Sequence, residues 1–171
     1  MPKKATRAEV TSHARPLWAP WRMKYIVSSK ADGCFLCAKS RGDDLANHVV
    51  ARGERVFALL NTFPYNSGHV LVAPYRHVAD LDLLEPDERR ELLDMIIQAK
   101  ATMAKVMQPQ GFNIGFNIGE IAGAGVADHV HGHIVPRWAG DTNFMPVLGD
   151  LRVVPQALED TAELLRQAWR H

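Results

Sequence analysis

Three histidines at alternate positions constrain this chain more than any other feature. His129, His131 and His133 are separated by single residues. Successive side chains of a β-strand point to opposite faces, so this period of two predicts a strand over 129–136 with a row of imidazoles on one face. Two chemistries need such a row. One is a metal centre, and the other is nucleophilic catalysis, in which one imidazole attacks while its neighbours fix its tautomer and protonate the leaving group.

The segments around this row predict an α+β fold. Apolar residues alternate in 112–118, and the β-rich segments 55–61 and 69–74 flank a turn, so we expect them to form adjacent antiparallel strands. Helical spacing of apolar residues predicts one helix over 86–107 and a second over 154–169. The order β-β-α-β-β-α with short connections favours an antiparallel sheet with helices on one side.

Length and charge favour one globular domain preceded by a basic arm. The chain has 171 residues, is 47% hydrophobic and carries a formal net charge of +1, which excludes intrinsic disorder. Residues 1–30 hold seven lysines and arginines against Glu9, a net charge of +6. We therefore expect 1–15 to be a mobile arm and 16–171 a single domain. The arm is either a solubilising or partner-contacting tail or an attractor of a polyanion such as a nucleotide phosphate chain.

Two partner classes are excluded by what the sequence lacks. No apolar run reaches the roughly 18 residues of a membrane span, and no signal-peptide core follows the first basic residues, so we expect a cytoplasmic protein with no membrane partner. No motif of a nucleic-acid module is present, which argues against nucleic-acid binding.

A loop of small residues precedes the histidine row and is typical of a phosphate site. Gly123, Ala124 and Gly125 let backbone N–H groups approach a ligand and form a concavity that holds anions. Asn117 opens toward the same region from the neighbouring strand, and its amide can hydrogen-bond a phosphate or hydroxyl group.

The stretch HVHGHIV at 129–135 resembles the signature of the histidine-triad superfamily. The stretches around it resemble the bacterial branch that contains diadenosine tetraphosphate phosphorylases, and the resemblance covers roughly residues 16–146. These stretches are LWAPWR (17–22), CFLC (34–37), LLNTFPYNSGH (59–69), PYRHVADL (74–81), GFNIGFNIG (111–119) and HIVPRWAGDTNFM (133–145). The resemblance implies an antiparallel sheet of about five strands with a long central helix and a C-terminal helix.

The same resemblance implies a homodimer. Segment 16–26 crowds Trp18, Trp21 and Tyr25 into a short stretch punctuated by proline, and it is our candidate for the contact between subunits.

The resemblance also implies site roles. His131, the middle member of the triad, would attack the α-phosphorus of a nucleoside polyphosphate and form a nucleotidyl-imidazole intermediate, with His129 and His133 beside it. Asn61 matches the ribose-binding asparagine of the family. Phe57 and Leu59 lie on the same predicted strand, where they either pack on the base or belong to the ordinary core.

The resemblance does not fix which acceptor resolves the nucleotidyl intermediate in the second step of the reaction. The loop AGAGVAD at 122–128 lacks the Gln and Ser or Thr side chains that hold phosphate oxygens in eukaryotic members. Water or inorganic phosphate could resolve the intermediate. Trp138 follows the triad in the PRW pattern of the phosphorylase-like branch, so we expect phosphorolysis of diadenosine tetraphosphate to ATP and ADP. The alternatives are a hydrolase or nucleoside phosphoramidase on the same scaffold, or a nucleotide- or metal-binding module without turnover.

Cys34 and Cys37 are the only cysteines and form a C-x-x-C pair. A redox role needs a strand before the pair, which SSKADG does not predict. Two cysteines leave a zinc site two ligands short, and the resemblance implies that His77 and His129 complete it. Such a zinc ion would be structural, because four protein ligands close its shell. The alternative is an unmetallated pair of buried thiols.

Overall fold

The computed structural model describes residues 33–141 and 157–169. The predicted arm 1–15, the aromatic segment 16–26 and residues 154–156 of the predicted C-terminal helix lie outside the described residues. The elements in chain order are α2 (Phe35–Arg41), β1 (Val49–Arg52), β2 (Val56–Leu60), β3 (Val70–Pro74), the 3-10 turn η1 (Leu81–Leu83), α3 (Pro86–Met107), β4 (Gly111–Phe116), the 3-10 turn η2 (Glu120–Ala122), β5 (Gly132–Arg137) and α5 (Leu158–Trp169). None of these helices is long and apolar enough to cross a membrane.

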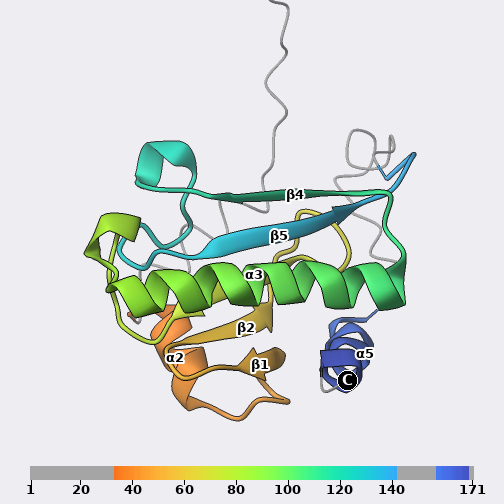
Figure 1. The fold of residues 1–171 in the computed structure, drawn as a ribbon, viewed down its shortest axis with the longest axis horizontal. Helices are drawn as coiled ribbons and strands as arrows, with labels where there is room; N and C mark the ends of the chain where they lie inside the picture. Colours follow the sequence, from red (N-terminus) through yellow and green to blue (C-terminus); the bar gives the residue numbers. More distant parts are fainter. Residues whose placement is uncertain (1–32, 142–156, 170–171) are drawn as a thin grey trace, which may run out of the picture.

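Five antiparallel strands form one sheet in the order β1-β2-β3-β5-β4 (Figure 1). The predicted hairpin is confirmed as β2 and β3, which pair from Val56 opposite Pro74 to Leu60 opposite Val70. The strand predicted over 112–118 is β4. His133 lies on β5 between its two neighbours, opposite a residue of β3 on one side and of β4 on the other.

The strand predicted over 129–136 begins later, at Gly132. His129 and His131 precede it, in a segment whose Val130 N–H donates to the carbonyl of Val78 at 2.7 Å. The three imidazoles therefore do not form one row on one face. The rings of His131 and His133 lie 4.8 Å apart, centroid to centroid, whereas the ring of His129 contacts the cysteine pair.

Helix α3 has the bounds that the sequence predicts, and its first turn explains why it begins there. Pro86 occupies the first turn, where its missing N–H costs nothing. The side chain of Glu85 accepts from the backbone N–H of Glu88, whose carboxylate accepts in return from the N–H of Glu85 at 2.8 Å. The helix ends at Gln108, which adopts a left-handed conformation.

The two faces of the sheet are covered to different extents. Helices α3 and α5 pack on one face and form the larger core with Val56, Ala58, Leu60, Val70, Val72 and Ile134. The opposite face carries a smaller cluster under α2, made of Leu36, Val49, Phe57, Leu59, Leu71 and Ala73. This second cluster lies on the β1-β2-β3 side, so the β5-β4 side of that face is left uncovered by described helices (Figure 1).

Helix α2 and strand β1 are not predicted from the sequence. Helix α2 has only seven residues, and its N-cap, Cys34, makes no side-chain capping bond. Strand β1 has four residues. Both elements are too short for hydrophobic periodicity to reveal them, and tertiary packing stabilises them instead.

Candidate active site and metal cluster

His131 is held so that one ring nitrogen is available for attack. It is 3% exposed, and its Nδ1 lies 2.8 Å from the carbonyl oxygen of His129. A carbonyl can only accept, so Nδ1 carries the proton and Nε2 keeps its lone pair. Burial lowers the pKa of His131, and the hydrogen bond to His129 raises it in part. The side chain is therefore suited to act as a neutral nucleophile.

A fourth histidine, His69, belongs to the site and was missed by the sequence analysis. It is buried at the start of the segment that leads into β3, and its Nε2 lies 3.0 Å from Nδ1 of His133. The backbone N–H of Tyr65 donates to Nδ1 of His69 at 3.1 Å. Nδ1 of His69 is therefore an acceptor, and its Nε2–H must donate to His133.

This relay fixes the tautomer of His133. Because Nδ1 of His133 accepts from His69, the neutral ring carries its proton on Nε2. The side-chain amide of Asn117 lies 3.5 Å from that Nε2. The structure therefore brings Asn117 to His133, and an amide turned so that its oxygen faces the ring accepts from the Nε2–H. The ring of His133 lies beside that of His131.

Asn61 lies at the end of β2, next to the same relay. Its side-chain amide nitrogen lies 3.2 Å from Nδ1 of His69, and its Oδ1 accepts from the N–H of Phe63 at 3.0 Å. The pairing of β3 with β5, which the sequence does not reveal, explains the position of His69. His69 stands two residues before Leu71, which pairs with His133, so the two side chains share one face of neighbouring strands.

In the predicted phosphate loop, the available backbone N–H groups begin at Gly125, two residues after the predicted start at Gly123. The N–H groups of Gly123 and Ala124 donate within the loop, to the carbonyls of Glu120 at 2.9 Å and Gly119 at 3.4 Å. The next backbone N–H groups, those of 125–129, donate to no atom of the described residues. Of the three predicted positions, Gly125 therefore opens a run of five successive donors that leads to the triad, an arrangement that suits an anion.

Three further predicted residues, Phe57, Leu59 and Trp138, are not among the hydrogen-bonded groups around His131 and His133. Phe57 and Leu59 are fully buried under α2, where Phe57 stacks on Tyr75 with ring centroids 5.3 Å apart, so we assign both to the core. Trp138 follows β5 in a turn whose Asp141 carboxylate accepts its backbone N–H at 3.2 Å.

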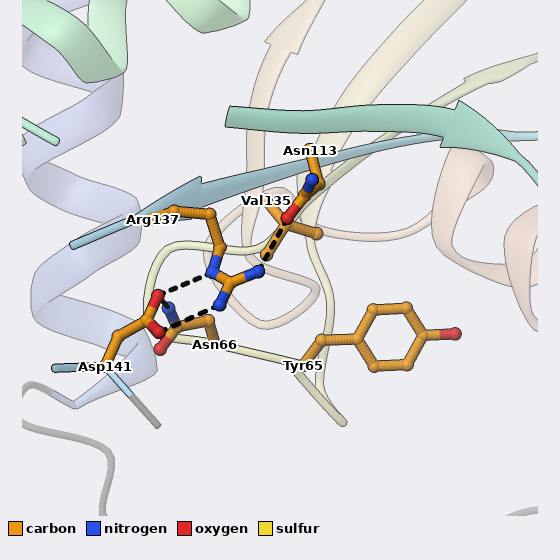
Figure 2. A pocket seen from close by; sticks show the side chains of 6 residues that line it. All are labelled: Tyr65, Asn66, Asn113, Val135, Arg137 and Asp141. Carbon is orange, nitrogen blue, oxygen red and sulfur yellow. Dashed lines mark hydrogen bonds and ion pairs between the residues drawn. The ribbon is translucent and has the colours of Figure 1, made fainter. Parts of the chain in front are cut away.

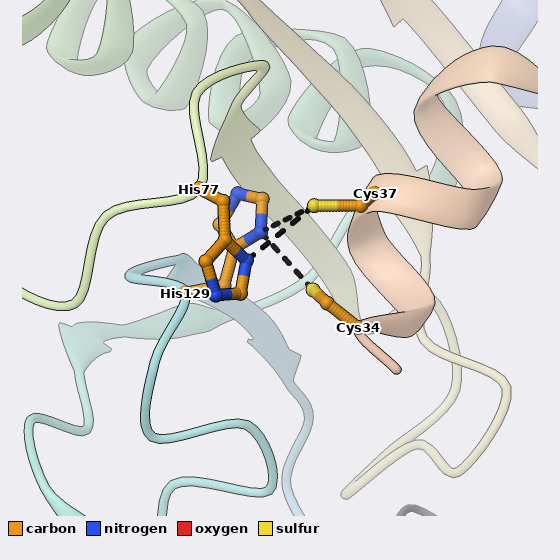
Figure 3. Close-up of side chains that lie close together, drawn as sticks. All are labelled: Cys34, Cys37, His77 and His129. Atoms are coloured by element: carbon orange, nitrogen blue, oxygen red, sulfur yellow. Dashed lines mark hydrogen bonds between the residues drawn. The ribbon is translucent and has the colours of Figure 1, made fainter. Parts of the chain in front are cut away.

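The C-x-x-C pair and two histidines form a compact cluster, as the resemblance implies (Figure 3). One ligand atom from each of Cys34, Cys37, His77 and His129 lies within 4.8 Å of all the others. Nδ1 of His129 is 3.1 Å from Cys34 Sγ and 3.5 Å from Cys37 Sγ, and Nδ1 of His77 is 3.4 Å from Cys37 Sγ. Tetrahedral zinc with ordinary bond lengths places its ligand atoms roughly 3.3–3.8 Å apart. The two spacings to Cys37 fall in that range and the one to Cys34 is slightly shorter, so small shifts of these side chains would suit that ion.

The tautomer of His129 also suits a metal ligand. Its Nε2 lies 2.9 Å from the carbonyl oxygen of Pro74, to which it must donate. The lone pair of Nδ1 then points at the cysteines, and the Nε2–H has the backbone acceptor typical of metal-bound histidines. Burial raises the pKa of the Cys34 thiol in the metal-free arrangement. The ring of His129 thus lies in the cluster, and its carbonyl oxygen accepts from His131.

Comparison with known proteins identifies a family and several similar proteins. Residues 43–140 match the family described as HIT domain. The chain is 41% identical over 162 residues to a Mycobacterium tuberculosis protein named AP-4-A phosphorylase, covering 90% of this chain and 83% of the relative. A Schizosaccharomyces pombe bis(5'-nucleosyl)-tetraphosphatase (asymmetrical) is 36% identical over 97 residues, 57% of this chain and 53% of the relative. Among solved structures, a Zn-bound histidine triad family protein from Mycobacterium smegmatis is 26% identical with a TM-score of 0.65, covering 81% of this chain and 94% of that one.

Proposed function

Because this chain belongs to the HIT domain family, we propose that it cleaves dinucleoside polyphosphates, diadenosine tetraphosphate above all, through a nucleotidyl intermediate on His131. The observation that carries the proposal is the hydrogen bond from Nδ1 of His131 to the carbonyl of His129, which leaves Nε2 as a lone-pair donor in a buried site. A histidine with a purely structural role needs neither an available Nε2 nor, just before it in the chain, the N–H groups of 125–129, which bond no described residue.

The first step is a substitution at the α-phosphorus. Nε2 of His131 forms a bond to this phosphorus, and the bond from phosphorus to the bridging oxygen breaks, so ATP leaves with the electron pair. The Nε2–H of His133, on the neighbouring ring, can hydrogen-bond the departing oxygen. The backbone N–H groups of 125–129 are donors for the equatorial oxygens, whose charge grows in the transition state.

In the second step we propose inorganic phosphate as the acceptor. A phosphate oxygen attacks the same phosphorus, the nitrogen–phosphorus bond breaks, and ADP forms while Nε2 regains its lone pair. Water is far more concentrated, so phosphate succeeds only if the site holds it in line. Asn117, 3.5 Å from Nε2 of His133, and the backbone N–H of Gly125 are candidates for holding it, and Trp138 is a further candidate from the motif it occupies. The name of the mycobacterial relative supports this choice.

Product analysis tests the reaction. Diadenosine tetraphosphate is incubated with the protein at saturating phosphate and without phosphate, and the nucleotides are separated by chromatography. We expect ATP plus ADP with phosphate, and slower formation of ATP plus AMP without it. The products ATP and AMP alone in both samples would establish the hydrolase that the fission yeast relative suggests. Absence of both turnover and an acid-labile protein adduct would favour a non-catalytic nucleotide-binding module.

We further propose that Cys34, Cys37, His77 and His129 hold one structural zinc ion. Four protein ligands close the shell, so the ion would supply no open position for substrate and would join α2 to the segment before β5. The Zn-bound structural relative supports zinc as the metal. We place the protein in the cytoplasm, where reducing conditions keep both cysteines available as ligands.

We also propose a homodimer, with β4 as the contact. This strand is one of the two edges of the sheet, and Ile114 on it is 46% exposed. On α3, Leu93 (57%) and Ile97 (55%) are also exposed. An apolar hollow of about 190 Å³ lies between the two elements, lined by Leu92, Ile96 and Phe116 among others. A second copy would cover this edge and its apolar flank. Light scattering should give a dimer that Ile97→Lys converts to a monomer, and a monomeric wild type would contradict this contact.

A further inference from the structure

A cavity of about 240 Å³ lies beside the triad and is used by none of the roles assigned so far. It is lined by Tyr65, Asn66, Asn113, Val135, Arg137 and Asp141 (Figure 2). The ring of Tyr65 stands on one side of it, and the polar group of Asn66, Arg137 and Asp141 stands on the other. Ligand pockets for drug-sized molecules have roughly 300–1,000 Å³, so this cavity has room for part of a nucleotide and not for a whole one.

The cavity is continuous with the triad along β5. Val135 and Arg137 follow His133 at alternate positions, so all three side chains point to the uncovered face of the sheet. They lie about 7 and 13 Å from His133 along the strand. The Tyr65 ring is shared between the two places, because it also stacks on His133 with centroids 5.7 Å apart. A chain of linked phosphates that starts at His131 can bridge this separation.

The charges of the lining cancel, which argues against a phosphate as the occupant. The guanidinium of Arg137 meets both carboxylate oxygens of Asp141, and its third nitrogen donates to Oδ1 of Asn113 at 2.7 Å. Asn66 Nδ2 also donates to Asp141, at 2.8 Å. The positive charge therefore already has its counter-ion, and the network instead holds two side-chain amides in fixed orientations.

The amide of Asn66 also donates to the carbonyl of Pro136 and accepts from the N–H of Ser67. What remains for a ligand is an aromatic ring, an apolar floor and the oriented amide of Asn113. Val135 forms the floor, and Tyr65 is 40% exposed, which leaves ring surface for stacking. Asn113 points from the edge strand β4 with its Oδ1 bound by Arg137, so its amide N–H groups face outward as donors. A flat neutral heterocycle with ring nitrogens satisfies this combination better than an anion does.

We propose that this cavity binds the base of the second nucleoside, the one that departs with the polyphosphate leaving group. The inference rests on the proposed function and deepens it. The chain then has two nucleoside positions, one near Asn61 after the end of β2 and one between β5 and β4, and both lie next to His69, whose Nδ1 contacts Asn61 and Tyr65. This arrangement selects dinucleoside polyphosphates over mononucleotides that carry the same phosphate chain.

Binding of two matched ligands tests the proposal without requiring turnover. Calorimetric dissociation constants are measured for diadenosine tetraphosphate and for adenosine 5'-tetraphosphate, which lacks the second nucleoside, with His131→Asn protein so that neither is consumed. We expect the dinucleotide to bind at least about fivefold more tightly, the lower end of the range for stacking one base. Asn113→Ala and Tyr65→Leu should each reduce that preference, while Gln98→Ala, an exposed amide on α3, should leave it unchanged.

The outcomes separate this inference from the proposed function. Equal affinities for the two ligands, or a preference that survives both substitutions, would overturn the second nucleoside position. A different outcome is that Asn113→Ala removes the binding preference while the wild-type protein turns over neither ligand. That result would support the second nucleoside position and overturn the proposed reaction. In an active enzyme, Asn113→Ala should lower kcat/KM for the dinucleotide at least fivefold and change kcat/KM for adenosine 5'-tetraphosphate less than twofold.

Discussion

The two faces of the sheet carry opposite kinds of side chain, although they are built from the same five strands. On the face under α3 and α5, strand β5 presents Ile134, fully buried in the larger core. On the other face it presents His133 beside His69 and His131. The first face is completed by the chain's own helices. On the second face, the described residues leave a lone pair and a cavity that a ligand can occupy, next to a run of backbone donors.

This difference shows how one strand can separate stability from function. Because side chains alternate, adjacent residues of the segment that contains the triad belong to different faces. Gly132 faces α3, and a Cβ built there would lie 2.9 Å from Cδ1 of Ile96 and 3.1 Å from a ring carbon of Phe116. His131 and His133, on either side of it, serve the open face. Substitutions at neighbouring positions should therefore change different observables.

The largest effect is expected at His131. His131→Asn removes the attacking nitrogen but keeps an amide N–H that can reach the carbonyl of His129, so kcat should fall by at least about 10⁴-fold. The free energy of unfolding should change by no more than about 1 kcal/mol. Turnover assays and chemical denaturation measure the two quantities. His48→Asn is the matched control, because asparagine tolerates the positive φ of that residue and His48 is outside the site. A His131→Asn protein with a near-normal rate would rule out the nucleophile.

The metal cluster comes next, because it joins the small cluster under α2 to the triad. Cys34→Ala with Cys37→Ala should remove about one zinc per chain and lower the free energy of unfolding by more than about 3 kcal/mol. Elemental analysis and thermal unfolding measure both, and Ser40→Ala on the same helix serves as the control. Zinc that stays bound after the double substitution would point to the triad histidines instead. A metal-free wild type with an unchanged melting temperature would exclude a structural role.

Gly132→Val tests the covered face alone. The added methyl groups must displace Ile96 or Phe116, and overpacking of this kind costs about 1–3 kcal/mol of unfolding free energy. Well below the melting temperature, kcat should fall less than tenfold, because the side chain points away from the triad. Loss of activity without loss of stability would show that the faces are not independent.

The smallest effect concerns Glu88, where the loop that carries His77 meets α3. Glu88 is buried, and its ion pair with Arg76 at 2.6 Å lowers the pKa of the carboxyl group. A lowered folded-state pKa stabilises the protein above the unfolded value of about 4.3, and this contribution disappears as the pH falls through the folded value. Glu88→Gln should lower Tm by roughly 2–4 °C at pH 7. The difference from wild type should shrink toward pH 3, and a constant difference would contradict the assignment.

The sequence predicts those parts of the molecule in which one signal dominates. Helix α3 is correct because apolar spacing, Pro86 and the acidic first turn agree, and β2 and β3 are correct because alternation and turn residues agree. The later start of β5 could not be foreseen. The period of two spans two different environments, because His129 lies beside the cysteine pair before the strand begins, whereas His133 is paired on β5 with Leu71 and Gly115.

The features of the site that the sequence does not predict depend mostly on contacts between residues far apart in the chain. His69 acts through His133, 64 residues away, and only the pairing of β3 with β5 brings them together. The burial of Phe57 and Leu59 depends on α2, whose seven residues carry no clear helix signal. Which donors of the loop stay available depends on its conformation, because the N–H groups of Gly123 and Ala124 bond within the loop and those of 125–129 do not.

The contact between Cys34 and His129 joins residues that are 95 positions apart. Contacts of such high sequence separation form late in folding, because the entropy of closing a long loop must be overcome before they contribute stability. The carbonyl that orients His131 belongs to this same residue. In a partly folded chain the ring of His131 is therefore not yet oriented, even where the helices are already formed. Activity should return during refolding only when this closure is complete, later than the recovery of helical signal.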